Sequence, residues 1–239
     1  MSLAIVNKTV LVTGANRGLG QALVDEALKR GAKRVYAASR RPMEVSDQRV
    51  TPLILDVTAP EQIQEAVDRV QSLDVLVNNA GVSVADDLSD RSAFEQHLAV
   101  NLYGTLDVTR AFLPSLTRSG GAVVNIVSLG AVAAVPVLPA YSVSKAASLS
   151  LTQSLRALLA GRGVSVYAVM PGPIDTDMVR GLDIPKTSAE DVARGTLDGV
   201  ERGEEEIFPD LMSRSLADGW RAGVAKQLER QNAALVPAE

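Results

Sequence analysis

Short apolar runs alternate with helical patterns along most of this chain of 239 residues, and this alternation constrains the fold more than any other feature. Six runs have the length and composition of buried strands, at residues 10–12, 35–38, 53–55, 75–77, 122–127 and 164–169. Helical periodicity fills most of the intervals, at residues 19–30, 60–70, 92–116 and 139–160. Strands that alternate with helices predict an α/β fold: a doubly wound parallel sheet with right-handed crossovers and helices on both faces.

The part of the chain beyond Thr187 shows secondary structure but no functional motif. The pattern predicts an amphipathic helix at residues 190–200, a seventh strand at residues 206–208, and a helical segment that carries Trp220 at residues 211–228, within about 210–230. We expect residues 232–239 to form a frayed tail. Because nothing marks a boundary, residues 1–239 are interpreted as a single domain.

Composition excludes several classes of function. The chain has no cysteine and one histidine, which rules out thiolate catalysis, a His-based triad and Cys- or multi-His metal sites. We expect this histidine, His97, on a helix surface or interface. The net charge of −4, with dispersed Lys and Arg, argues against nucleic acid and anionic membranes as partners. Neither a signal pattern nor an apolar run of membrane-spanning length is present, so we expect a soluble, cytoplasmic protein without a metal.

Polar, glycine or proline residues follow every predicted strand, and ligands of such sheets bind beyond the carboxyl ends of the strands. These positions are 13–20, 39–40, 56, 78–81, 128 and 171–172. One elongated ligand could touch them all.

The turn after the first strand carries three glycines, Gly14, Gly18 and Gly20. Glycines between a strand and a helix let the backbone approach a pyrophosphate, and the helix N-terminus offers free N–H groups and a favourable dipole. The spacing is Gly-x-x-x-Gly-x-Gly rather than the usual Gly-x-Gly-x-x-Gly of dinucleotide sites. A plain tight turn is the alternative interpretation.

Tyr141 and Lys145 lie four positions apart in the predicted helix 139–160, so they project from one face. An ammonium beside a phenol lowers the phenol's pKa and makes it a usable acid or base. Ser128, at the end of the fifth strand, could donate a hydrogen bond to a substrate oxygen. Taken alone, such a Tyr–Lys pair is commonly a coincidence on a helix surface.

Together these motifs resemble the short-chain dehydrogenase/reductase (SDR) family in its classical form, from about Lys8 to Met178. The residues that carry the resemblance are the glycine turn 13–20, Asp56, the tetrapeptide 78–81, Asn101, Ser128, Tyr141 with Lys145, and Pro171-Gly172. The resemblance implies a Rossmann-type sheet of about seven strands. It also implies an enzyme that reduces a ketone or aldehyde to an alcohol, or the reverse, by hydride transfer from a nicotinamide cofactor.

The resemblance assigns four catalytic residues. Tyr141 is the acid, Ser128 holds the substrate oxygen, and Lys145 lowers the pKa of Tyr141 and binds the nicotinamide ribose. Asn101 positions a water that relays protons. For Asn101, a purely structural role as a helix-kink residue is the alternative.

Charge at the end of the second strand predicts NADP(H) rather than NAD(H). Ser39 stands where an acid would repel a 2′-phosphate, Arg40 follows it, and Arg17 lies in the glycine turn. The alternative is that Arg40 and Arg41 belong to a solvated loop. By resemblance, the cofactor-binding residues are Gly14, Asn16, Arg17, Gly18, Leu19, Gly20, Ser39, Arg40, Asp56, Val57, Asn79, Ala80, Gly81, Tyr141, Lys145, Pro171, Gly172, Ile174 and Thr176.

The apolar loop 129–138 leads from Ser128 to Tyr141 and is expected to line the substrate site, which predicts a small, largely apolar substrate. Its alternative role is packing against another subunit. Residues 177–187, with Met178, Val179 and Leu182, are expected to form a lid over the nicotinamide. The helices 92–116 and 139–160 have apolar surface for a homodimer or homotetramer. The competing functions are a non-catalytic NADP-binding regulator and a cofactor-free dehalogenase.

Overall fold

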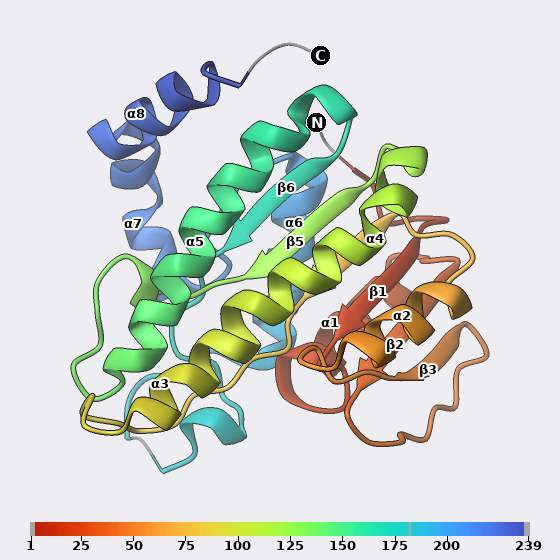
Figure 1. Cartoon of the computed structure of the whole chain (residues 1–239), viewed down its shortest axis with the longest axis horizontal. Helices are drawn as coiled ribbons and strands as arrows, with labels where there is room; N and C mark the ends of the chain where they lie inside the picture. Colours follow the sequence, from red (N-terminus) through yellow and green to blue (C-terminus); the bar gives the residue numbers. More distant parts are fainter. Residues whose placement is uncertain (1–2, 182, 237–239) are drawn as a thin grey trace.

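The computed structural model describes residues 3–181 and 183–236. A parallel sheet of seven strands, in the order β3-β2-β1-β4-β5-β6-β7, forms the centre of the molecule (Figure 1). The strands are β1 (Thr9–Thr13), β2 (Arg34–Ser39), β3 (Val50–Ile54), β4 (Val75–Asn78), β5 (Ala122–Ile126), β6 (Ser165–Val169) and β7 (Glu206–Ile207). The predicted doubly wound α/β fold is confirmed, and so is the seventh strand.

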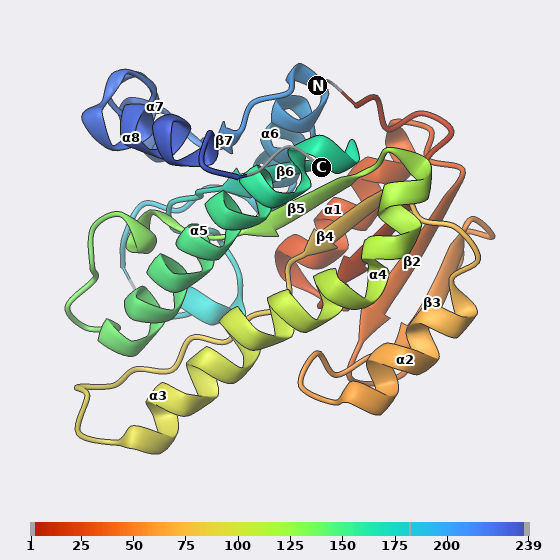
Figure 2. The ribbon, with the colours of Figure 1, turned by 45° about the horizontal axis from the view of Figure 1, so that its top comes forward.

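Helices cover both faces of the sheet, as Figure 2 shows, with α1 and α6 on one side and α2, α4 and α5 on the other. The helices are α1 (Gly18–Lys29), α2 (Pro60–Arg69), α3 (Arg91–Leu98), α4 (Thr105–Ser119), α5 (Pro139–Leu159), α6 (Ala189–Arg202), α7 (Leu211–Ala222) and α8 (Val224–Ala233). Pro60 and Pro139 each stand in the first turn of a helix, where a missing N–H costs nothing.

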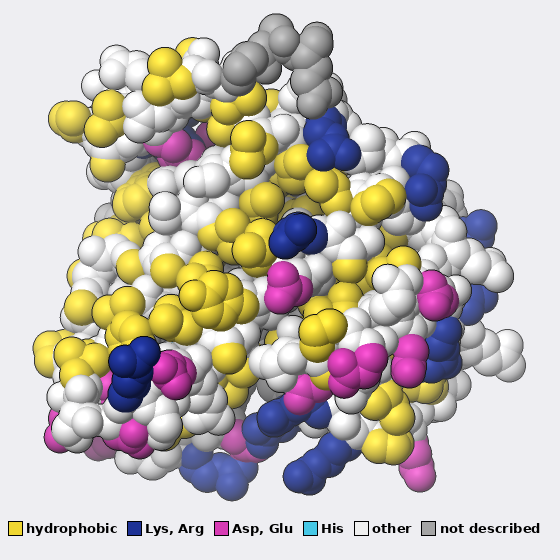
Figure 3. Space-filling view, in the orientation of Figure 1, with side chains coloured by type: hydrophobic (Ala, Val, Ile, Leu, Met, Phe, Trp, Pro, Cys, Tyr) yellow, Lys and Arg dark blue, Asp and Glu magenta, His cyan; other side chains and the backbone are white. Residues whose placement is uncertain are grey.

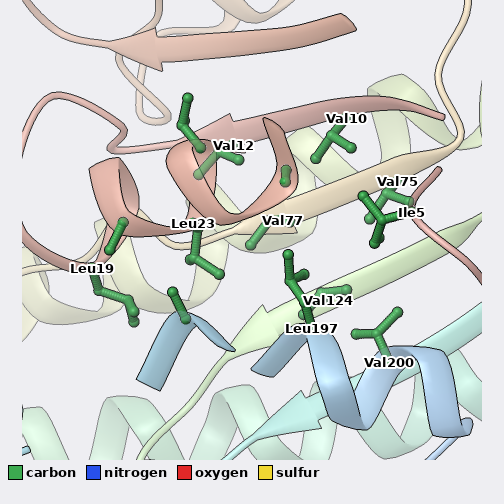
Figure 4. Close-up of a cluster of buried hydrophobic side chains, with 14 of the residues drawn as sticks. Ile5, Val10, Val12, Leu19, Leu23, Val75, Val77, Val124, Leu197 and Val200 are labelled. Carbon is green, nitrogen blue, oxygen red and sulfur yellow. The ribbon is translucent and has the colours of Figure 1, made fainter. Parts of the chain in front are cut away.

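Strand residues alternate between two hydrophobic cores. Val10 and Val12 of β1 pack with Leu23 of α1 and Leu197 of α6 (Figure 4), whereas Leu11 packs on the opposite face, beneath α2 and α4. Because side chains of a strand point to alternate faces, a continuous apolar run is required when both faces are covered. This is why the predicted strands read as unbroken hydrophobic stretches.

Two predicted helices are divided in the structure. The helix expected at 92–116 is α3, a π-helical segment (Ala99–Gly104) and α4, which ends at Ser119. The helical segment expected at 211–228 is helical but consists of two helices: Gly223 is extended, at φ −72° and ψ 154°, and separates α7 from α8. The predicted tail is wrong at its start, because α8 continues to Ala233, and residues 237–239 lie outside the described residues.

Ion pairs attach the C-terminal helix α8 to the sheet and to α5. The ammonium of Lys226, with only 1% of its side chain exposed, lies 2.8 Å from Glu205, 2.9 Å from Glu206 and 3.0 Å from Glu229. Arg156 of α5 pairs with the same Glu206, at 2.8 Å. These contacts join elements that are far apart in sequence.

Figure 3 shows hydrophobic side chains gathered over α4 and α5 on one face of the molecule. Val143 and Leu158 of α5 and Tyr103 of the π segment are among the exposed ones. Within the residues described, no helix is long and apolar enough to cross a membrane, and no cluster of His, Cys, Asp or Glu side chains could hold a metal ion.

Candidate active site

The turn between β1 and α1 takes its shape from glycines. Gly14 and Gly18 have positive φ angles, +66° and +54°, which residues with a Cβ rarely adopt. A Cβ on Gly20 would stand 2.1 Å from the carbonyl oxygen of Gly14, closer than any side chain tolerates. Asn79, at the end of β4, fixes this turn by donating to the carbonyl oxygens of Thr13 and Gly14, at 2.9 and 3.2 Å.

The N-terminus of α1 points its first backbone amides at the carboxyl edge of the sheet. Its N-cap residue, Arg17, makes no side-chain hydrogen bond to these amides. Leu19 of the first turn is buried in the core among α1 and α6 (Figure 4), so only its backbone is left to face a ligand. Unpaired amides and the helix dipole together make an anion site of this kind suited to a pyrophosphate.

The ends of β2 and β3 carry the residues expected to choose the cofactor. Ser39 is buried and its hydroxyl donates to the carbonyl oxygen of Arg41, at 2.5 Å, while Arg40 is exposed. Burial alone would raise the pKa of Asp56, but the hydrogen bonds from Thr58 and the charge of Arg40 lower it by more. The net shift of this pKa is downward, so the carboxylate is ionised. An exposed guanidinium therefore stands at this corner of the sheet.

Two of the predicted cofactor residues already have contacts within the protein. Val57 is buried, and a Cβ on Gly104 would meet it at 2.6 Å, so its side chain belongs to the core. Arg17 already has an anionic partner, because its guanidinium lies 2.8 Å from Asp177 of the expected lid.

Ser128, Tyr141 and Lys145 meet beyond the end of β5. Ser128 makes a side-chain hydrogen bond with Tyr141. The ammonium nitrogen of Lys145 lies 5.7 Å from the centre of the Tyr141 ring and donates to the carbonyl oxygen of Ile126, at 2.8 Å. The fold thus brings together the three residues that the sequence predicted to converge.

Burial acts on both titratable groups of this trio. Desolvation raises the pKa of Tyr141, and the hydrogen bond with Ser128 opposes that rise. Desolvation also lowers the pKa of Lys145 to about 8. The pKa of Tyr141 is therefore shifted upward overall, whereas the Tyr–Lys spacing alone predicts a downward shift of this pKa.

Asn101 lies within the π segment and is 2% exposed. Its side-chain amide contacts Val82, by accepting from the N–H at 2.9 Å and donating to the carbonyl oxygen at 3.0 Å, and donates to Ser144 at 2.9 Å. Its own carbonyl oxygen accepts from the hydroxyl of Ser148, at 2.7 Å. Asn101 thus occupies a helix irregularity and also ties the neighbouring segment to α5.

Gly81, in the loop that follows β4, lies beside both Asn101 and Lys145. A Cβ at this position would lie 3.2 Å from the side-chain oxygen of Asn101 and 3.7 Å from the ammonium of Lys145. The glycine therefore keeps a narrow space free next to both residues.

The segment after β6 borders the same edge. Pro171 accepts a hydrogen bond from the N–H of Leu129, at 3.0 Å, and Ile174 pairs with Thr187 in an isolated bridge. A Cβ on Gly18 would lie 3.1 Å from the methyl group of Thr176, so the expected lid begins against the glycine turn. Leu182, expected in the lid, lies outside the described residues.

A comparison with models of protein families identifies the family of this chain. The model of the short chain dehydrogenase family matches residues 8–186, most of the chain. The chain belongs to this family. The predicted resemblance is confirmed, and the match extends slightly beyond the region from which it was inferred.

Similar short-chain dehydrogenases cover most of this chain. A short chain dehydrogenase from Burkholderia cenocepacia, solved in complex with NADP, is 36% identical and has a TM-score of 0.88. The alignment covers 98% of this chain and 100% of that chain. Estradiol 17-beta-dehydrogenase 2 of the rat is 34% identical over 91% of this chain. This chain spans 57% of the length of that relative and 52% of the mouse protein of the same name. A 3-amino-tetrahydro-pyrrolizinone reductase from Xenorhabdus hominickii is 36% identical over 88% of this chain and 76% of its own length.

Sequence reasoning missed two residues that support this candidate site. Asp210, 3% exposed, caps α7 through Ser213 and also accepts from the N–H of Gly172, at 2.8 Å, which links the C-terminal helices to the end of β6. An Asp before a helical pattern signals the cap, but nothing in the sequence signals the contact with Gly172. The expectation that His97 lies on a helix surface or interface is wrong: it is fully buried within the chain, and its ring lies against Tyr141.

Proposed function

We propose that this short-chain dehydrogenase is an NADP(H)-dependent oxidoreductase that reduces a ketone or aldehyde to an alcohol, or catalyses the reverse reaction. The observation that carries the proposal is the meeting of Ser128, Tyr141 and Lys145 beyond β5, at the same sheet edge as the glycine turn of α1. A carbonyl reduction needs a hydride donor, a proton donor and a group that binds the carbonyl oxygen as it gains charge. The trio fits the last two requirements.

The chain's own residues fit a dinucleotide along this edge. The glycine turn and the first amides of α1 would bind the pyrophosphate, and Asp56, Asn79, Ala80 and Gly81 would border the adenosine half. Pro171, Gly172, Ile174 and Thr176 would border the nicotinamide. When bound, the cofactor supplies or accepts the hydride at the substrate carbon.

Ser128, Tyr141 and Lys145 would bind the carbonyl oxygen and supply its proton. Ser128 would donate a hydrogen bond to the carbonyl oxygen, and Tyr141 would transfer its phenolic proton to that oxygen as the carbon accepts the hydride. The phenolate left on Tyr141 would be stabilised by the nearby ammonium of Lys145 and reprotonated from solvent, for which we keep the prediction that Asn101 positions a water.

Arg40 supports NADP(H) over NAD(H), since it is an exposed cation at the end of β2 beside the buried Ser39. A guanidinium there would bind the 2′-phosphate through charge-assisted hydrogen bonds. Arg17 supports it less directly, because Asp177 competes for the same guanidinium. The similar enzyme from Burkholderia cenocepacia in complex with NADP is consistent with this assignment.

The substrate is proposed to be small and largely apolar near the reacting carbon. Residues 132–137 of the loop between β5 and α5 are all exposed in this protein and include Val132, Val135 and Val137. Apolar side chains left in water beside a reacting group are suited to an apolar ligand. A homodimer or homotetramer that pairs α4 and α5 stays a prediction, as does a cytoplasmic location.

The test is oxidation of NADPH and of NADH across small aldehydes, ketones, diketones and β-keto esters, by the wild-type protein and Tyr141→Phe. We expect turnover with NADPH by the wild-type protein, and loss of turnover with nearly unchanged NADPH binding in the variant, because only the proton donor is removed. Substantial turnover by Tyr141→Phe would contradict the mechanism. NADPH binding by the wild-type protein without turnover of any substrate would favour the alternative function, a non-catalytic NADP-binding regulator.

A further inference from the structure

His97 lies on α3 with no exposed surface, and both nitrogens of its ring have backbone partners. Nδ1 lies 2.7 Å from the carbonyl oxygen of Ala93, which can only accept, so Nδ1 carries the proton. Nε2 is then the acceptor for the N–H of Val84, at 3.1 Å. The surroundings therefore select a neutral imidazole in one tautomer.

His97 makes one of three contacts described here that hold the segment 82–86, which follows β4 and Gly81. The side-chain amide of Asn101 pairs with both backbone groups of Val82, and His97 accepts from Val84. His97 and Asn101 are four positions apart along α3 and the π segment, so they face the same segment and hold alternate residues of it.

The third contact joins this segment to the helix that carries Tyr141. Both carboxylate oxygens of Asp86 lie 3.3 Å from the amide nitrogen of Ala140, in the first turn of α5. The N-cap of α5, Leu138, provides no side-chain cap, and a carboxylate is favourable at a helix N-terminus. Asp86 therefore serves as a cap supplied from a distant part of the sequence.

The ring of His97 also packs directly against Tyr141. The two ring centroids are 6.4 Å apart at an interplanar angle of 73°, an edge-to-face contact. Tyr141 is thus restrained twice by the same histidine: through its ring, and through the segment 82–86 that caps the turn on which it stands.

We propose that His97 is a positioning residue for the reaction proposed above, on which this inference rests. Its Nε2 acceptor holds Val84, and through the segment 82–86 and the ring contact it keeps the phenol of Tyr141 directed at Ser128. His97 itself transfers no proton. Its role requires the acceptor on Nε2, whereas the bond from Nδ1 to Ala93 only orients the ring.

Two substitutions separate these two bonds. In His97→Gln, the side-chain oxygen reaches the place of Nε2 and can accept from Val84. In His97→Asn, the amide reaches the place of Nδ1 and can donate to Ala93, but it leaves Val84 without its acceptor. Each variant is measured for kcat/KM, NADPH affinity, thermal stability and hydrogen exchange of peptides that cover residues 82–86.

We expect His97→Asn to lose about tenfold in kcat/KM, since one hydrogen bond and its positioning effect are lost, with unchanged NADPH affinity and faster exchange in 82–86. His97→Gln is expected to stay within about threefold of the wild-type kcat/KM, with wild-type exchange. Equal behaviour of the two variants, or losses that follow thermal stability alone, would overturn the proposal. If the wild-type protein turns over no substrate, the proposed function is wrong, and so is the proposed effect of His97 on the reaction. The exchange data still decide whether His97 holds the segment.

Discussion

Lys145 is the residue at which stability and the proposed chemistry conflict. Its ammonium is buried, 6% exposed, and desolvation lowers its pKa to about 8, from an ordinary value near 10.4. Below pH ~8 both the folded and unfolded chains hold this proton, so the folded state carries the full desolvation cost. Between pH ~8 and ~10.4 the folded chain releases the proton first, so this cost disappears as the pH rises.

Lys145→Met is therefore expected to increase the free energy of unfolding at pH 7. The desolvation cost is roughly 3 kcal/mol, and loss of the hydrogen bond to Ile126 offsets about 1 kcal/mol, so we expect a gain of about 1–2 kcal/mol. Urea titrations of both proteins at pH 7 and pH 10 measure it. The difference between them should shrink or vanish at pH 10, and a variant that is less stable by the same amount at both values would contradict this assignment.

Arg40 is the residue on which the cofactor preference is expected to depend. Arg40→Asp removes the cation and adds a charge that repels the 2′-phosphate, so we expect NADPH affinity to fall by about 10–100-fold and NADH affinity to change little. Fluorescence titration with each cofactor measures both constants. Arg118→Asp, an exposed arginine at the far end of α4, is the control with the same change in net charge. Equal losses for the two cofactors in Arg40→Asp would refute the NADP assignment.

At the scale of elements, the sequence predicted what local patterns encode and missed what packing decides. Apolar runs and the Pro60 and Pro139 signals placed the strands and the starts of α2 and α5. The sequence offered a helix kink at Asn101 only as an alternative, because the π segment there depends on contacts with Val82 and Ser144 from distant parts of the chain. For the same reason a periodicity argument cannot show that His97 faces Tyr141.

The attachment of α8 is another such contact, and its strength can be measured. Lys226→Ala leaves Glu206, 3% exposed, with Arg156 still 2.8 Å away but without its second cationic partner, so a buried carboxylate loses part of its compensation. We expect the free energy of unfolding to fall by about 1–3 kcal/mol, measured by the fluorescence of Trp220, the only tryptophan. The exposed pair Arg91–Glu95 is the control, and Arg91→Ala should cost at most ~0.5 kcal/mol. Similar effects of the two substitutions would show that the Lys226 cluster adds no more than a surface pair.

On the scale of the whole molecule, the candidate site belongs to no single element. Its residues come from the ends of β1 to β6, so the strand order β3-β2-β1-β4-β5-β6-β7 is what places Arg40 at one end of the edge and Tyr141 toward the other. The sequence predicted this gathering because parallel strands end on one edge. It could not predict contacts made in three dimensions, such as the pair of Arg17 in the glycine turn with Asp177 of the expected lid.

Because the proposed cofactor would contact most strands of the sheet, its binding should stabilise the molecule as a unit. At free NADPH 100-fold above Kd, linkage adds about 2.7 kcal/mol, which for a chain of this size raises Tm by roughly 5–10 °C. Scanning calorimetry with NADPH, NADH and no ligand measures this shift, and NADH at the same concentration should give a clearly smaller one. EDTA should leave Tm unchanged, since no group of side chains in the described residues could hold a metal. Equal shifts with the two cofactors would mean that the adenosine end of the site does not recognise the 2′-phosphate, and no shift with either would remove the dinucleotide from the proposal.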